Sequence, residues 1–201
     1  MDAKSFSDWV IAQLALPSKA RHRQMADRHT LFQQDYVRTL LSIDAEHASQ
    51  VGGLEGRTFQ QAVGLQAAWD RFRLAGASDL LLGIFPPRSL TDTRGYVDLE
   101  GRKLEFISVD EFNRYQLEQQ ADWTWERTRE FAIQSTGALQ AFFAHPHLLS
   151  VHVLEASPEA PCTLPDGRRI TSLALGWVFW IACLQQYLVE FSPRLAGLLV
   201  E

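Results

Sequence analysis

An uncharged stretch near the end of the sequence restricts what this chain can fold into more than any other feature. No charged residue occurs from Ile170 to Val189, and within that stretch Leu173–Leu184 is apolar throughout. A stretch of about twenty residues can cross a bilayer, whereas a shorter unbroken apolar run is typical of a helix buried in a protein core. Thr171 and Gln185 lie outside the apolar run and are polar. We therefore expect a core helix here and keep a membrane span over 170–189 as the alternative.

A buried helix requires a sizeable core, and the composition supplies one. The chain has 201 residues, of which 46% are hydrophobic, including twelve phenylalanines and six tryptophans. A single domain of this length buries roughly 70% of the surface of its unfolded chain, so neither a metal nor a disulfide is required for folding. We expect one globular domain over residues 1–201.

The spacing of apolar residues predicts a fold that combines helices and strands. Apolar residues at steps of three and four predict helices over 6–16, 19–50 and 58–75, the last of them ending at Gly76. Ser108, with Glu111 three residues later, predicts the capped start of a further helix. Alternating residues and hairpin turns such as Asp166-Gly167 predict strands between them. The expected class is α+β and mostly helical, with about six helices, one of them long, and a small mainly antiparallel β-sheet. We expect that sheet to come from 80–107 and 148–170.

Charge and cysteine usage narrow the classes of protein. The net charge of −5 argues against nucleic acid as a partner, because nucleic-acid binders gain most of their affinity from basic surface. Cys162 and Cys183 show no CxxC spacing, which excludes a multi-cysteine zinc site and fits two buried thiols in a reducing compartment. The chain starts without the basic segment of a secretory signal. We therefore expect a cytoplasmic protein without a cofactor.

Three histidines, His145, His147 and His152, form the pattern most suggestive of a metal site. Residues two apart on a strand point the same way, so His145 and His147 could grip one ion, but Pro146 disturbs a regular strand. His152 would face the other side of such a strand. We therefore predict an ordinary strand after a helix end. The three histidines, with a carboxylate such as Glu155 or Asp166, remain the ligand set of an alternative function, a metal-dependent hydrolase.

A basic segment begins the long predicted helix. Lys19, Arg21, Arg23 and Arg28 occur there, with only Asp27 opposing them. Cations at a helix N-terminus oppose the helix dipole, so stability alone does not favour this arrangement. Solvated side chains would explain it, but it also suits contact with an acidic surface of another protein.

The segment WTWERTREF combines the two residue types that dominate protein-binding hot spots. Trp123 and Trp125 stand beside Arg127 and Arg129. The two tryptophans cannot share one face of a helix, so we expect one in the core and the other at the surface. Together with the basic segment, these residues form the predicted binding surface.

The absence of a complete catalytic pattern decides the functional prediction. The sequence contains no GxSxG elbow, no phosphate-binding loop and no dinucleotide fingerprint. We therefore predict a non-enzymatic bacterial protein of the accessory or immunity-like kind. It would bind another protein through its basic and Trp/Arg patches. The metal-dependent hydrolase and a membrane-associated protein are the alternatives.

Overall fold

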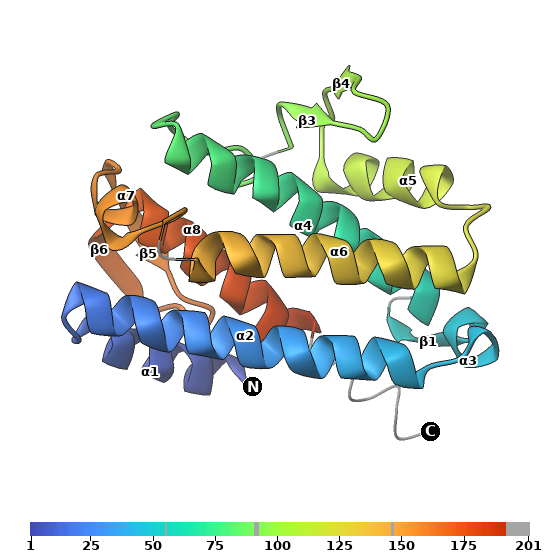
Figure 1. Ribbon diagram of the computed structural model, residues 1–201, viewed down its shortest axis with the longest axis horizontal. Coiled ribbons are helices and arrows are strands. Elements are labelled where there is room, and N and C mark those ends of the chain that lie inside the picture. Colours follow the sequence, from blue (N-terminus) through green and yellow to red (C-terminus); the bar gives the residue numbers. More distant parts are fainter. Residues whose placement is uncertain (55, 91–92, 146, 192–201) are drawn as a thin grey trace.

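The architecture is given by a computed structural model that describes residues 1–54, 56–90, 93–145 and 147–191 (Figure 1). Four helices make up the body of the molecule. They are α2 (Ser18–Ser42), α4 (Phe59–Leu81), α6 (Trp125–Ala144) and α8 (Leu175–Gln185). In Figure 1, α2 and α8 run in one direction and α4 and α6 in the other. The middle helix α6 contacts both α2 and α4, so these elements form a bundle.

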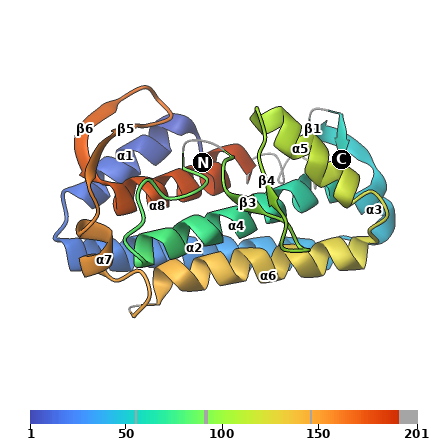
Figure 2. The same ribbon diagram turned by 90° about the horizontal axis from the view of Figure 1, so that it is seen from above.

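Shorter helices flank the bundle. They are α1 (Ala3–Leu14), α3 (Ala45–Ser49), α5 (Val109–Gln119), α7 (Val151–Glu155) and the π-helix η1 (Gln186–Phe191), which directly continues α8. Seen from above, α1 and α5 lie towards opposite ends of the molecule (Figure 2).

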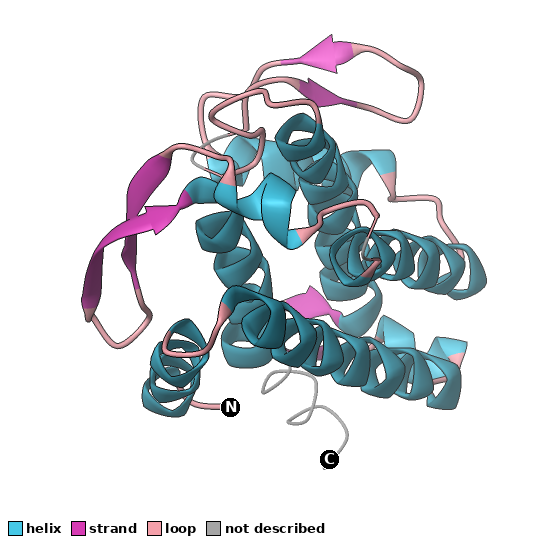
Figure 3. Cartoon of the chain, turned by 60° about the vertical axis from the view of Figure 1, so that its left-hand side comes forward, coloured by secondary structure: helices cyan, strands magenta, loops and turns pink. Residues whose placement is uncertain are grey.

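The strands form three separate antiparallel hairpins within the described residues, where we had expected one small sheet. They are β1 (Val51–Leu54) with β2 (Arg57–Thr58), β3 (Tyr96–Val97) with β4 (Lys103–Leu104), and β5 (Glu159–Thr163) with β6 (Arg169–Ala174). The hairpins of β3–β4 and β5–β6 lie at the outside of the helices (Figure 3). The predicted class, a mostly helical α+β fold with antiparallel strands, is confirmed. The helices are more numerous than expected and the strands do not join.

Helix boundaries follow local capping chemistry. The side chain of Thr58 accepts from the backbone N–H of Gln61, and the Gln61 side chain accepts from the backbone of Thr58, so α4 begins with a capping box. Ser108 caps α5 and Thr124 caps α6 by the same kind of bond. The helix predicted over 19–50 ends at Ser42, and α3 follows after a short break.

The uncharged stretch forms the helix that we expected in the core. The side chains of Trp177, Phe179 and Trp180 in α8 are at most 1% exposed. Since α8 has apolar residues on all sides, it packs against several elements. It contacts α7 and the β5–β6 hairpin. Its rings also reach the other long helices. Trp180 meets His29 of α2 and Phe143 of α6, and Phe179 lies against Gly76 of α4. None of the helices in the described part combines the length and the hydropathy that a membrane crossing requires.

Two segments that we predicted as strands are not strands. Leu80 and Leu81 are the last residues of α4, and the rest of the apolar run, to Phe85, forms turns. The strand expected after 148 is the short helix α7, capped by Ser150. A short apolar run has the same periodicity in a buried strand and in a buried helix turn, so the pattern alone could not separate them.

Helix α4 continues through Gly76, which we had placed at its end. A Cβ at this position would lie 2.2 Å from the carbonyl oxygen of Arg88 and 2.8 Å from Cζ of Phe179. Gly76 is therefore a point of close approach between α4, the segment after it and α8.

Candidate functional site

A carboxylate lies at the centre of the bundle. Asp70 in α4 is completely buried. It accepts hydrogen bonds from Gln66 Nε2 at 2.8 Å, from Thr136 Oγ1 at 2.5 Å and from Tyr187 Oη at 2.6 Å. These donors come from α4, α6 and η1, so the carboxylate joins three elements. Burial of a charged group is costly unless donors and a counter-charge surround it, and Asp70 has both.

Burial and the counter-charge act on the pKa of Asp70 in opposite directions. Desolvation raises this pKa above its ordinary value, and the positive charge of Arg73 and the three hydrogen bonds lower it. The net shift is upward. The guanidinium Nη1 of Arg73 lies 3.6 Å from Asp70 Oδ1, which is an ion pair but too long for a good hydrogen bond.

Two further polar side chains are buried near this carboxylate. Among the described residues, the hydroxyl of Tyr36 has no hydrogen-bond partner, and burial together with the charge of Asp70 raises its pKa well above the ordinary value. His29 accepts at Nδ1 from the indole N–H of Trp180 at 3.4 Å, whereas its Nε2 is buried without a partner in the described chain. Burial lowers the pKa of His29 to about 3, so this ring is neutral near pH 7.

A pocket of about 330 Å³ opens beside this polar centre, between α4, α5 and η1. Gln66 and Arg73 of α4, Asn113 of α5 and Gln186 of η1 belong to its lining. The pocket and the polar centre therefore share Gln66 and Arg73. A volume of about 300 Å³ or more is in the range of small-molecule sites.

Arg73 connects the pocket with Asp70. Its side chain is 12% exposed, and its guanidinium lies over the ring of Trp69 at 5.6 Å from the centroid. Its Nη1 is buried and makes no hydrogen bond within the part of the chain that the structure describes. A guanidinium has five N–H donors, so Arg73 keeps donors for a further acceptor.

The pocket wall on the η1 side is a π-helix. Gln186, its first residue, donates from Nε2 to Oε1 of Gln66 at 3.3 Å, across the two helices. Glu190 and Phe191 of η1 also line the pocket. π-helical turns are rare and occur frequently at functional sites.

The basic segment predicted as a binding surface is only partly available. Lys19 and Arg23 are exposed. Arg21 instead donates to the backbone oxygens of Leu14 and Leu16 at the end of α1, and lies over Trp177 at 5.0 Å. Arg21 therefore donates to carbonyl oxygens that have no partner within the last turn of α1.

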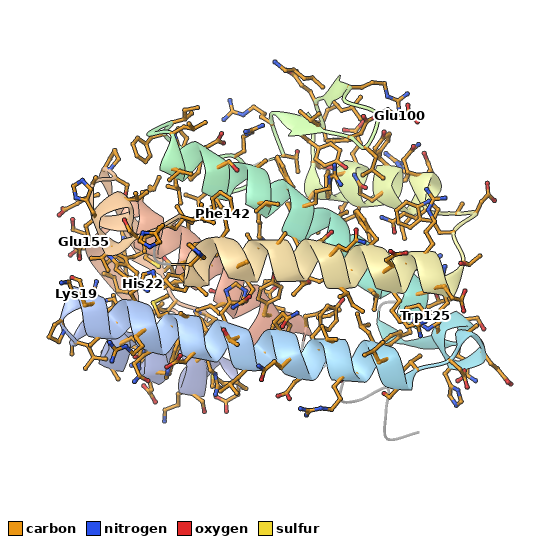
Figure 4. The ribbon with its side chains drawn as sticks, in the orientation of Figure 1. Lys19, His22, Glu100, Trp125, Phe142 and Glu155 are labelled. Carbon is orange, nitrogen blue, oxygen red and sulfur yellow. The ribbon has the colours of Figure 1, made fainter. Side chains whose placement is uncertain are left out.

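The remaining basic residue of this segment is also partly covered. Arg28 is half-buried, and its Nε has no partner in the described residues. Figure 4 shows Lys19 at the end of the bundle where Glu155 and His22 also lie. The exposed cations of the segment are thus fewer than the sequence suggested.

The two tryptophans of the Trp/Arg segment have different environments, as expected. Trp125 is 3% exposed and donates from Nε1 to the carbonyl of Ile43 at 2.9 Å, so it belongs to the core (Figure 4). Trp123 is half-buried, and the exposed Arg127 lies over its ring at 4.4 Å. Arg129 lies over Trp125 at 6.0 Å. Of the two rings, only Trp123 can meet a partner directly.

The three histidines do not form a metal centre. His145 and His147 are exposed with ring centroids 5.6 Å apart, and the backbone N–H of His147 donates to His145 Nδ1. His152 is exposed on α7. No group of three or more histidine, cysteine, aspartate or glutamate side chains suited to a metal ion occurs in the described residues. The hydrolase alternative has lost its ligand set.

Neither the pocket nor its polar centre was predicted from the sequence. The available signal was Asp70, four residues after Gln66 on a helix otherwise rich in buried apolar residues. The second signal was Gln186 at the end of the uncharged stretch. Polar residues inside an apolar face indicate a satisfied core network or a site.

Comparison with known proteins adds information on the fold only. No family model matches the sequence, and no curated protein matches it. Among solved structures, the chain is similar to a mutant of the mycothiol-dependent maleylpyruvate isomerase, with a TM-score of 0.53 and 15% sequence identity. The match covers 85% of this chain and 58% of the isomerase chain. At this level of identity, the likeness shows a shared fold for that part of the isomerase.

Proposed function

We propose that this chain binds a small organic molecule that carries a carboxylate, in the pocket between α4, α5 and η1. The observation that carries the proposal is Arg73. Its side chain is nearly buried, its ion pair with Asp70 is 3.6 Å long, and Nη1 makes no hydrogen bond in the described chain. A guanidinium matches the two oxygens of a carboxylate, so the pocket offers the group that such a ligand needs.

The surroundings of Arg73 support this proposal. Asp70 and the ring of Trp69 hold the guanidinium in place. The amides of Gln66, Gln186 and Asn113 add donors and acceptors to the pocket wall. A preorganised site loses less conformational entropy when its ligand binds. The solved structure with a similar fold is that of an isomerase, which is compatible with a small-molecule site on this fold.

Isothermal titration with a matched pair of probes tests the proposal. We expect 4-methylpentanoate to bind and its amide, 4-methylpentanamide, to bind at least about tenfold more weakly, because a hydrogen bond between charged groups is replaced by a neutral one. Arg73→Gln should remove the difference between the two probes. Arg38→Gln is the control, since Arg38 is 78% exposed on α2 and lies outside the pocket lining. Equal binding of acid and amide to the native protein would exclude a carboxylate site.

A second function is favoured by a separate observation, the Arg127 guanidinium over Trp123. This pair borders a pocket of about 260 Å³ whose lining also includes Leu99, which is 50% exposed. We propose that this face binds another protein, since exposed tryptophan and arginine are typical of interface hot spots. An acidic partner in the bacterial cytoplasm, for a protein of the accessory or immunity-like kind, is the finer form of this proposal.

A binding experiment separates this second function from the first. Proteins captured by the native chain should be lost with Trp123→Ala and with Arg127→Glu, whereas Arg38→Glu should keep them. Both variants leave the pocket beside Arg73 intact, so binding of 4-methylpentanoate should not change. Partners that survive both substitutions would rule out this face.

A further inference from the structure

We infer that the pocket beside Arg73 takes a zwitterion, an α-amino acid with an apolar side chain, in preference to a plain carboxylic acid. The inference rests on the proposed function and adds the class of ligand. It starts from the charges of the pocket lining, which carries two cations, Arg57 and Arg73, and two anions, Asp110 and Glu190.

The charge balance of the lining favours a ligand that carries both signs. A plain carboxylate would gain from Arg57 and Arg73 and lose from repulsion by Asp110 and Glu190, so the four charges together offer it no net attraction. An α-amino acid also carries an ammonium group, which turns this repulsion into attraction. The zwitterion has no net charge, and the two cations and two anions of the lining also sum to zero.

The two anions are available to an ammonium group. Asp110 and Glu190 are both exposed, on α5 and on η1. Within the described residues, Asp110 makes no ion pair, and Glu190 accepts a single hydrogen bond, 3.4 Å long, from Gln185 Nε2. Arg73, by contrast, is nearly buried. The carboxylate of the ligand would therefore lie deeper than its ammonium group.

The same pocket also has an apolar part. Ala62, Leu65 and Phe191 belong to its lining, and each is at most 9% exposed. Trp69 adds a half-buried ring. These residues suit an aliphatic side chain, because its removal from water is favourable in proportion to the apolar area covered.

L-leucine is the matched probe, because it is 4-methylpentanoate with an α-amino group. We expect L-leucine to bind the native protein about tenfold more tightly than 4-methylpentanoate in isothermal titration. The double variant Asp110→Asn, Glu190→Gln should reverse this order. It should weaken binding of L-leucine and strengthen binding of 4-methylpentanoate, because both the attraction and the repulsion are removed.

Each outcome decides one proposal. If 4-methylpentanoate binds through Arg73 as tightly as L-leucine does, the inference of a zwitterion is wrong and the proposed carboxylate site stands. An unchanged preference for L-leucine in the double variant also overturns it. If neither probe binds, or if Arg73→Gln leaves the binding of both unchanged, the proposed function fails and this inference fails with it. Glu118→Gln, an exposed change on α5 outside the pocket lining, controls for the loss of negative charge.

Discussion

At the scale of single residues, Asp70 is the side chain on which most others depend. It lies without solvent contact at the meeting point of α4, α6 and η1. A buried carboxylate is tolerated because its hydrogen bonds and its ion pair offset the cost of desolvation. Asp70 also keeps Arg73 in place beside the pocket. The stability of the bundle and the readiness of the pocket therefore depend on one network.

Replacing Asp70 should be severely destabilising. In Asp70→Ala, three donors and the charge of Arg73 lose their buried acceptor, and we expect a loss of about 3–5 kcal/mol in the free energy of unfolding. Urea unfolding followed by circular dichroism measures this loss. The control is Asp35→Ala on α2, whose carboxylate is 72% exposed in its pair with Arg38, and there we expect less than about 1 kcal/mol. Losses of equal size would show that the central network contributes no stability.

Asp98 should make stability depend on pH at the acid end. Desolvation of Asp98, which is 6% exposed, raises its pKa, but hydrogen bonds from Arg102, Tyr115 and the backbone N–H of Glu100 outweigh this effect and lower the pKa to about 2. Because folding lowers the pKa of Asp98, its ionised carboxylate stabilises the native state at pH values above the ordinary pKa of 3.8. That stability is lost as the pH falls from about 4 through about 2. Urea unfolding across this range should show a steeper loss for the native protein than for Asp98→Asn.

At the scale of elements, Gly76 in α4 and Gly137 in α6 differ in the space that their surroundings leave for a side chain. Gly76 faces a backbone oxygen and an aromatic ring at distances that leave no room for a methyl group. A Cβ at Gly137 in α6 would meet Gln33 Nε2 at 3.8 Å, which is an ordinary van der Waals contact. Both lie inside helices, where alanine is intrinsically favoured over glycine.

The two alanine substitutions should therefore have opposite signs. Gly137→Ala should raise the free energy of unfolding by up to about 1 kcal/mol. Gly76→Ala should lower it by about 1–3 kcal/mol, because α8 or the segment at Arg88 must move. Thermal unfolding of both variants measures the difference. A stabilised Gly76→Ala protein would mean that the close approach of α4 to its neighbours is absent in solution.

Elements were predictable from the sequence where a single segment contains all of the information. The turn at Asp166-Gly167 and the Ser108 cap depend on neighbouring residues, and both were predicted correctly. Gly76 and the run after Leu80 depend on what packs against them, and both were misread. Likewise, Ser150 caps the start of α7, but this cap was not recognised in the sequence because the interpretation of this segment rested on its histidines.

At the scale of the whole molecule, the candidate site could not be predicted because its members are far apart in the sequence. Asp70 meets Thr136 and Tyr187 at separations of 66 and 117 residues. No spacing rule covers such distances, whereas the histidines attracted attention by being close in sequence. The sequence did predict different environments for Trp123 and Trp125, but the physical reason differs from the expected one. Trp123 lies before Thr124, the N-cap of α6, so the two tryptophans do not share a helix.

The reactivity of the buried cysteines measures how often the folded chain opens. Cys162 and Cys183 are both free and buried, and burial raises the pKa of Cys183 to about 12. A thiol reacts as its thiolate, so we expect negligible labelling of Cys183 by iodoacetamide in the native protein at pH 8. Labelling in increasing urea should follow the unfolding curve measured by circular dichroism. Fast labelling without denaturant would show that the β5–β6 and α8 region opens on its own.

The π-helix at one wall of the pocket makes that wall sensitive to the number of its residues. A π turn holds about one residue more than an α turn, so α8 changes its winding from Gln186 to Phe191. Deleting one residue there would allow the α-helix to continue and would rotate the following residues by about 100° around the helix axis. Glu190 and Phe191 would then leave the pocket. This segment should accept many substitutions in evolution but few insertions or deletions.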